Sequence, residues 1–441
     1  MLSLIKNKYF QSSSYGQNVR SKEMCYNFVY EVFNMIIYAN KINNDRLYFL
    51  KMNISGHPLL EEGLEFSLVN DARITPNTSE RLTHLIGNLW INNLITIVGK
   101  NATGKTTIMK LMIGLMQNIV AGNSITQSEL NDVLIGKNPI KVDVYFYGTK
   151  GYIYKDSLTY SLNINSHQWY IEDEKIYQKK ITPSMSKTKM FDFTKAKVVL
   201  DRKELDTVAA SILSPDDSVF KSIISKEDYY VQAPVNTLFY TNFNALTYIQ
   251  ENVPTEILTF LDPSIEYLKI DFRKDDTEKD IYRLKFKNSD TEIVENSFTN
   301  ITKYLSSGTA KGISLYGLIM LTLESGGIIF IDEIEDHFNH TIVDAFIEYF
   351  TDKAINVNHA TLVFSTHYSE ILDQIDRTDE EYITRRDKKI SLQRYSQTHV
   401  RSDLSKAEVF ESDYLGGTAP EYDAYIALKK ATKRWVAKNN E

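Results

Sequence analysis

A short glycine-containing run, GKNATGKTT, has the residue types and the spacing that bind phosphate oxygens. It fits the pattern G-x-x-x-x-G-K-[ST], in which glycines let backbone N–H groups converge on an anion at the start of a helix. Lys105 is expected to reach the β and γ phosphates of a nucleotide, and the Thr106 hydroxyl to bind Mg²⁺. The predicted phosphate-binding residues are Gly99, Lys100, Asn101, Ala102, Thr103, Gly104, Lys105, Thr106 and Thr107. The alternative is a chance match in a lysine-rich loop.

Two adjacent carboxylates, Asp332 and Glu333, follow the apolar run IIFI. Carboxylates at the carboxyl end of a buried strand lie where open α/β sheets bind their ligands. Asp332 suits the Mg²⁺ shell, whereas Glu333 could orient or deprotonate a water that attacks the γ-phosphate. A solvated acidic helix start is the alternative interpretation, because the N-terminus of a helix favours carboxylates.

His367 ends a second apolar run, LVFSTH, 34 residues after Glu333. It is therefore expected at the same edge of the sheet, where a neutral imidazole could donate to a γ-phosphate and sense its loss. A lone histidine is more often structural than functional, and that alternative remains open at this point.

The stretch YLSSGTAKG places Ser306, Ser307 and Gly308 before an apolar helical run predicted from Gly312 to Glu324. One serine would suffice as a helix cap. Hydroxyls together with a glycine at a helix start also suit an anion. The sequence alone leaves both interpretations open.

These residues need an alternation of strands and helices to bring them together. A strand is predicted at Asn93–Gly99, followed by the helix TTIMKLMIGLMQNIV; a helix from about His340 to Ala354 separates the strands IIFI and ATLVFST. This alternation indicates a mostly parallel α/β sheet. Elsewhere, a hairpin is expected from Arg46, with its turn at Gly56-His57-Pro58, and an antiparallel meander from Ile140.

The predicted organisation has five parts. They are a leader with one helix (1–45), the first half of the nucleotide-binding core with the meander (46–200), an inserted mixed lobe with helices near 205–213 and 255–261 (201–300), the second half of the core (301–375), and an α/β tail with a basic helix (376–441). The acidic and basic tract RTDEEYITRRDKK in this tail is expected to be a solvated hairpin.

Composition narrows the classes of protein. The net charge of −7 argues against a uniformly basic nucleic-acid coat, and no apolar run reaches the ~20 residues that span a bilayer. A single cysteine, Cys25, excludes an internal disulfide and favours a reducing cytoplasm.

The order of these motifs resembles that of ABC-type ATPases, and LSSG is similar to their LSGGQ signature, with Ser307 and Thr309 as departures. The resemblance implies a P-loop NTPase of the α/β class, an ABC-type ATPase head with an antiparallel β lobe and an inserted helical lobe, which uses ATP and Mg²⁺. It also implies that Ser306 and Gly308 complete the site of a second subunit, so that the chain forms a dimer or a larger homo-oligomer. A Q-loop glutamine is expected too, with Gln127 and Gln168 as weak candidates.

Ser306 lies 201 positions after Lys105, a gap similar in length to that of the SMC, RecF and OLD group, which carries β and helical insertions there. Within it, the chain resembles stand-alone ATPases of phage-defence operons, such as the ATPase subunit of PARIS, which pairs with a TOPRIM nuclease, or that of Septu, which pairs with an HNH nuclease. This resemblance implies an ATP-hydrolysing switch, a separately encoded nuclease effector and a phage-encoded trigger, with nucleic acid as an optional partner and no membrane. The alternative is a RecF- or SMC-like DNA-repair or chromosome-maintenance ATPase.

Overall fold

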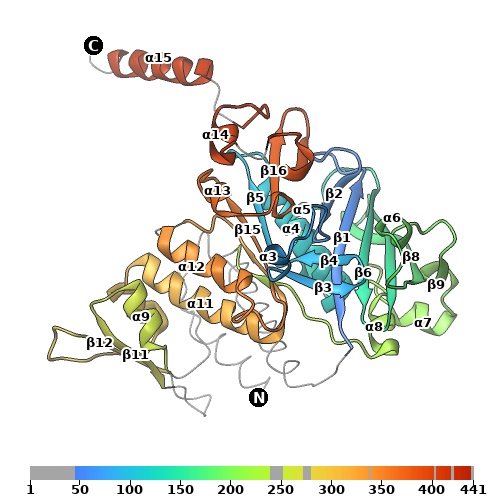
Figure 1. The fold of residues 1–441 in the computed structure, drawn as a ribbon, viewed down its shortest axis with the longest axis horizontal. Coiled ribbons are helices and arrows are strands. Elements are labelled where there is room, and N and C mark those ends of the chain that lie inside the picture. The colour runs from blue at the N-terminus through green and yellow to red at the C-terminus, as the bar shows by residue number, and fades with distance from the viewer. Residues whose placement is uncertain are drawn as a thin grey trace.

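The fold is that of a computed structural model, which describes residues 45–238, 252–271, 280–336, 338, 340–401, 404–418 and 422–438. The leader and its expected helix lie outside the described residues, except for Asp45. Within the described part of the chain, the helices are too short or too polar to cross a bilayer. Figure 1 shows a central sheet, a second sheet to its right and a small third sheet at the lower left.

The central sheet carries the predicted motifs. Its six strands run in the order β10-β14-β15-β5-β16-β17. Their bounds are Val235–Asn236 (β10), Ile328–Ile331 (β14), Thr361–Thr366 (β15), Leu94–Val98 (β5), Glu381–Arg386 (β16) and Ile390–Arg394 (β17). All neighbouring pairs are parallel except the last, so the carboxyl ends of β14, β15 and β5 meet at one edge. The predicted α/β class is confirmed.

Helices cover both faces of this sheet. Alternate residues of each strand point to opposite faces: Leu362 and Phe364 pack with α11 (Ser307–Ser325) and α12 (His340–Thr351), whereas Val363 packs with α4 (Lys105–Met116). A π-helical turn, Gln117–Ala121, extends α4. Helix α11 begins five residues before the predicted Gly312, because Ser306 already caps it.

The second sheet is antiparallel, with the order β2-β1-β6-β7-β8-β9. It contains the predicted hairpin, β1 (Leu47–Ser55) and β2 (Leu64–Ser67), and the predicted meander, β6 (Ile140–Gly148), β7 (Tyr152–Asn163) and β8 (Gln168–Lys180), to which β9 (Lys197–Asp201) is added. Helix α4 lies between the two sheets and shares one hydrophobic core with both of them. A short hairpin, β3 (Leu82–Ile86) and β4 (Leu89–Asn92), leads into β5.

The region expected as one inserted lobe has several parts. Helices α7 (Thr207–Ile212) and α9 (Thr255–Leu261) lie where helices were predicted. A three-stranded antiparallel sheet follows, with β11 (Ile265–Asp271), β12 (Ile281–Phe286) and β13 (Ile293–Glu295), and it shares a core with α9 and the start of α11. In contrast, β10 pairs within the central sheet, and Phe220 and Ile223 join the hydrophobic core of the two large sheets, so these parts of residues 201–238 do not belong to a separate lobe.

The expected boundary at residue 375 cuts through the central sheet, because β16 and β17 pair within it. The tract RTDEEYITRRDKK does form a hairpin, but its first half is not solvated: Arg377, Asp379, Glu380 and Glu381 are all buried. Three of these residues precede β16, and there Asp379 accepts the backbone N–H groups of Asp71 and Ala72 at 2.8 Å and pairs with Arg377 at 2.7 Å. Glu381 begins β16, which pairs with β5. Beyond it, α14 (Lys406–Glu411) packs on the core, and α15 (Tyr422–Lys438) extends away at the upper left of Figure 1.

The remaining helices are short connectors. They are α3 (Pro76–Ser79), α5 (Leu130–Val133), α6 (Lys187–Met190), α8 (Lys221–Glu227), α10 (Phe298–Ile301) and α13 (Ile371–Gln374).

Candidate nucleotide-binding site

The glycine-rich loop connects β5 to α4 as the sequence predicts. Backbone conformation explains part of its composition, since Gly104 has a φ of 96° and Ala102 one of 65°, the left-handed region that favours glycine. A Cβ at Gly99 would lie 2.1 Å from Thr384 Oγ1. The loop is therefore a tight cradle of backbone groups at the start of a twelve-residue helix.

Lys105 is buried at the first position of α4, with 5% of its surface exposed. Its Nζ donates to the carbonyl of Gly99 at 2.8 Å and to that of Lys100 at 3.3 Å. Burial lowers the pKa of Lys105, and the carboxylates of Glu333, Asp332 and Glu335 oppose that shift. The ammonium thus lies inside the loop, with carboxylates close enough to influence it.

Thr106 and Asp332 come together from different elements. The Thr106 hydroxyl donates to Asp332 Oδ2 at 2.7 Å. One hydroxyl and one carboxylate are a donor set that fits Mg²⁺, which usually binds few protein groups and completes its shell with water and phosphate oxygens. Among the described residues, no group of three or more histidine, cysteine, aspartate or glutamate side chains could hold a metal ion.

Ser365, on β15, is a site residue that the sequence interpretation missed. Its hydroxyl donates to Asp332 Oδ1 and accepts the backbone N–H of Glu333 at 2.9 Å. Glu333 itself has a φ of 48°, an unusual conformation for a residue with a side chain. Ser365 therefore fixes the turn that presents both carboxylates. The sequence signal that could have identified Ser365 is a hydroxyl residue next to the end of a buried strand.

His367 follows β15 and lies at the same edge, with 43% of its side chain exposed. Its partner is Glu335, a second residue that the sequence interpretation did not assign. Glu335 Oε1 accepts the backbone N–H of His367 at 2.7 Å and lies 2.7 Å from the ring Nδ1. The P-loop, the acidic pair Asp332 and Glu333, and His367 thus lie at one edge of the central sheet, as predicted.

Ser306 begins α11 as a helix cap, and its Oγ accepts the backbone N–H of Thr309 at 3.0 Å. It is exposed, whereas Ser307 and Gly308 are half-buried. One turn later, the buried Lys311 donates to Asp336 Oδ2 at 3.2 Å, which ties the start of α11 to the turn after Asp332.

The β16–β17 hairpin forms the outer wall of the phosphate loop. Thr384 Oγ1 lies 2.7 Å from Thr103 Oγ1 and donates to the Val98 carbonyl at 3.2 Å. On β17, Ile390 lies so close that a Cβ at Gly104 would be 2.5 Å from it. These contacts were not predicted, because the sequence does not tell which strand lies beside β5.

The two weak Q-loop candidates lie elsewhere. Gln168 begins β8 of the second sheet, and the exposed Gln127 ends the 3₁₀ turn Ile125–Gln127. Gln168 therefore lies outside the central sheet.

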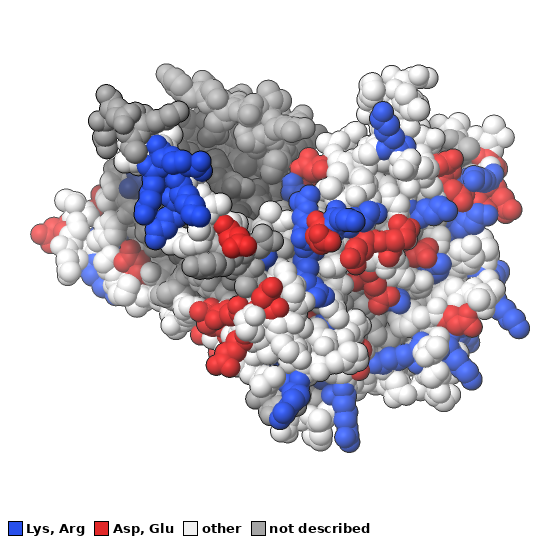
Figure 2. Space-filling view, turned by 90° about the horizontal axis from the view of Figure 1, so that it is seen from above, with Lys and Arg blue, Asp and Glu red and all other residues white. Residues whose placement is uncertain are grey.

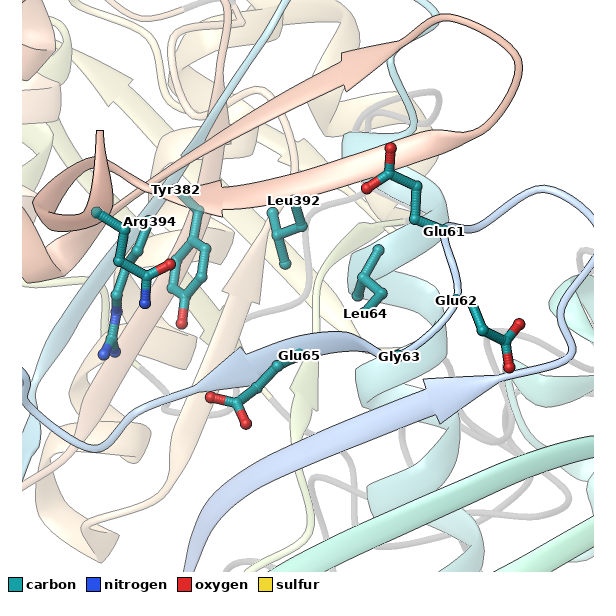
Figure 3. Close-up of a pocket in the computed structure, with 9 residues that line it drawn as sticks. Glu61, Glu62, Gly63, Leu64, Glu65, Tyr382, Leu392 and Arg394 are labelled. Atoms are coloured by element: carbon teal, nitrogen blue, oxygen red, sulfur yellow. The ribbon is translucent and has the colours of Figure 1, made fainter. Parts of the chain in front are cut away.

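A separate hollow of about 260 Å³ opens between β2 and β17 (Figure 3). Its lining residues are Glu61, Glu62, Gly63, Leu64, Glu65, Tyr382, Leu392, Arg394 and Gln397. Arg394 is already engaged, since it donates to the carbonyls of Ser67 and Val69. None of the predicted site residues lines this hollow, and its glutamates alone indicate no ligand.

The fold and this edge of the sheet define a P-loop ATPase domain. The chain belongs to the family described as "AAA domain, putative AbiEii toxin, Type IV TA system", whose model matches residues 94–373. No curated protein matches the chain. Two solved structures of the recombination mediator protein RecF in the RecFOR pathway, RecF-ATPrS and RecF-ATP, are 10% and 9% identical to it; each covers 79% of this chain and 98% of its own, with TM-scores of 0.35 and 0.33.

Proposed function

We propose that the chain is a Mg²⁺-dependent ATPase that works as an oligomeric switch over a separate effector. The observation that carries the ATPase part is the hydrogen bond between Thr106 and Asp332 beside the buried Lys105. These three groups are the phosphate-facing and metal-facing parts of a P-loop site. The family description names an AAA domain and a putative toxin of a type IV toxin–antitoxin system, so it supports a role in such a system and names no separate effector.

Each residue has a defined task in this proposal. The backbone N–H groups of the loop and the Lys105 ammonium bind the β and γ phosphates, and Thr106 with Asp332 holds the metal. Bound Mg²⁺ supplies positive charge next to the phosphate oxygens. Glu333 orients the attacking water, and His367 binds the γ-phosphate.

The exposed start of α11 supports composite sites. Ser306 and Gly308 lie at the N-terminus of a nineteen-residue helix, where backbone N–H groups and the helix dipole favour an anion. In the proposal, this start meets the nucleotide of a second copy, so that each site takes a phosphate loop from one subunit and a signature from the other. The Lys311–Asp336 contact then links the signature of a subunit to its own acidic turn.

A mixing experiment tests the composite site. Gly308→Glu places a carboxylate where a γ-phosphate must approach, and Lys105→Ala removes the phosphate-binding ammonium. Each variant alone should hydrolyse ATP poorly, whereas a verified mixed oligomer should recover part of the turnover, since one of its sites has both parts intact. Lys303→Glu, an exposed change just before the helix, is the control and should leave turnover unchanged. A mixed oligomer no more active than the sum of its parts contradicts shared sites and leaves Ser306 as a helix cap only.

The effector is proposed to be a nuclease encoded beside this chain, such as a TOPRIM protein, which is released or activated when a phage protein is sensed. The test is co-expression of the two proteins followed by co-purification, with cell growth measured during phage infection. Growth arrest that requires both genes and an intact Lys105 is the expected result. A neighbour that neither binds the ATPase nor changes the outcome of infection contradicts the antiphage role.

A second candidate is a DNA-binding ATPase of the RecF and SMC type, favoured by one observation. The exposed helix α15 carries Lys429, Lys430, Lys433, Arg434 and Lys438, and basic side chains gather over it in the face that Figure 2 shows. DNA-stimulated hydrolysis that is lost when these residues become glutamate supports this candidate. Hydrolysis that is insensitive to DNA supports the effector switch.

A further inference from the structure

Glu335 has an unusual environment for a carboxylate. It is 4% exposed, and its Oε1 contacts both the backbone N–H and the ring Nδ1 of His367. Its Oε2 has no hydrogen-bond partner among the described residues. A buried carboxylate is costly unless it is paired, so Glu335 has a strong preference for a donor at Nδ1.

This contact decides where the protons of His367 are. A carboxylate only accepts hydrogen bonds, so Nδ1 must carry a hydrogen when it faces Glu335. A neutral imidazole has one N–H, and its Nε2 is then a bare acceptor, which cannot donate to a phosphate. Only the doubly protonated ring offers an Nε2–H while it keeps its bond to Glu335. The inference drawn from this contact differs from the expectation that a neutral His367 donates to the γ-phosphate.

The neighbouring side chains of Tyr368, His340 and Lys105 do not take the place of Glu335 at the ring Nδ1 of His367. The ring of Tyr368 packs edge-on against the His367 ring, with 4.7 Å between their centroids, and the His340 ring, at the start of α12, has its centroid 5.6 Å from that of Tyr368. Lys105, on α4, is influenced by the charge of Glu335 but bonds to loop carbonyls. Among the described neighbours, Glu335 is the group in direct contact with Nδ1.

We propose that Glu335 is a positioning residue that makes His367 a cationic γ-phosphate donor, so that ATP binding takes up a proton whereas ADP binding does not. The inference rests on the proposed function, because it needs a γ-phosphate at this edge of the sheet. It adds a regulatory property: affinity for ATP relative to ADP falls as the pH rises.

The test measures binding rather than turnover. ATP and ADP affinities are determined by calorimetry between pH 5.5 and 8.5 with Mg²⁺ chelated, in two buffers of different ionisation enthalpy, which gives the protons taken up per nucleotide. Wild-type protein should lose roughly tenfold or more of its ATP affinity over this range, but not of its ADP affinity. The titration of ATP itself is common to all variants and cancels when they are compared.

Three variants separate charge from shape. Glu335→Gln keeps an acceptor for Nδ1–H but removes the charge, so the fall in ATP affinity should begin at a lower pH. His367→Ala should abolish the protein's share of the proton uptake. Glu370→Gln, an exposed change three residues after His367, is the matched control and should behave as wild type.

The outcomes are distinguishable. A Glu335→Gln profile that follows wild type at every pH, or equal pH dependence for ATP and ADP, overturns the inference. Failure of wild-type protein to bind ATP, or equal ATP binding by Lys105→Ala, contradicts the proposed function instead.

Discussion

Thr106 and Asp332 are joined by a 2.7 Å hydrogen bond across β15, the strand that separates β5 from β14 in the central sheet. The bond links the first turn of α4 to a turn 226 residues further along the chain. Asp332 directly follows β14, whereas Thr106 lies in the first turn of α4, which the phosphate loop connects to β5. Parallel pairing of β14 and β5 with β15 aligns the two strand ends from which these turns start. A metal ion would therefore meet a preorganised pair.

We predict that Lys105→Ala abolishes ATP binding and turnover without unfolding the protein. The ammonium is bound by the Gly99 and Lys100 carbonyls, and loss of one charged donor to a reacting group typically reduces turnover by about 10²-fold or more. Turnover, ATP binding and thermal unfolding are the measurements. Lys110→Ala is the control, because Lys110 lies on the same helix but pairs with Glu129 and Asp132. Wild-type turnover in Lys105→Ala contradicts the site.

Substitutions of the two acidic residues, Asp332 and Glu333, should affect ATP binding and turnover differently. Glu333→Gln should lower turnover by about 10²-fold or more while Mg²⁺-dependent ATP binding persists, because it removes only the group that orients water. Asp332→Asn should lose the effect of Mg²⁺ on binding, because Asp332 faces Thr106. The exposed Asp344→Asn on α12 is the control. If both site variants bind ATP equally well with Mg²⁺, the division of tasks is wrong.

Ser365→Ala should lower both stability and turnover. The change removes the acceptor of the Glu333 N–H and the donor to Asp332, and an unsatisfied buried group costs roughly 1–3 kcal/mol. Urea unfolding and ATP turnover measure the two effects. Ser314→Ala is a suitable comparison, since this buried hydroxyl donates to the Ala310 carbonyl within its own helix. A Ser365→Ala variant as active and as stable as Ser314→Ala would show that the turn does not need the hydroxyl.

Glu380 should make the free energy of unfolding depend on pH. Burial raises the pKa of Glu380 to about 8 despite Arg81 nearby, and its closest approach to Arg377 is 4.0 Å, too long for a hydrogen bond. The folded carboxyl thus keeps its proton up to about pH 8, whereas the unfolded one loses it above its ordinary pKa of 4.5. Stability should fall between these values as the pH rises, by up to ~1.4 kcal/mol per pH unit.

Glu380→Gln should remove this slope, so that the variant gains stability over wild type from pH 5 to pH 8. Urea unfolding at several pH values measures it, with the exposed Glu61→Gln as control. A constant difference between wild type and Glu380→Gln across that range would mean that the buried carboxyl does not titrate as proposed.

Much of the fold was predictable because its signals are local. The glycines and Lys105 identify the phosphate loop, and the four apolar residues before Asp332 predict β14. Helix α9 begins and ends at the residues predicted from its helical pattern. Parallel pairing then brings the strand ends together, as a general property of such sheets. The identity of the neighbouring strand was not predictable, since periodicity indicates a strand but not its partner.

Charge-rich sequence was the main source of error. Glu380 and Glu381 look solvated in the run DEEYITRR, yet both are buried, and Glu381 accepts a hydrogen bond from Lys406 at 2.8 Å. Glu335 and Ser365 were missed for a related reason. Their importance comes from contacts with residues more than 30 positions away, and no spacing rule within a single sequence records such contacts.

The outer wall of the phosphate loop has a consequence for synthesis on the ribosome. Thr384 contacts the Val98 carbonyl across 286 residues of chain. At about 5–20 residues per second, translation needs roughly 15–60 s to deliver β16 after β5 has emerged. Until then the nascent loop lacks Thr384 and Ile390, so the order of synthesis itself delays a complete phosphate cradle until nearly the whole ATPase core has been made.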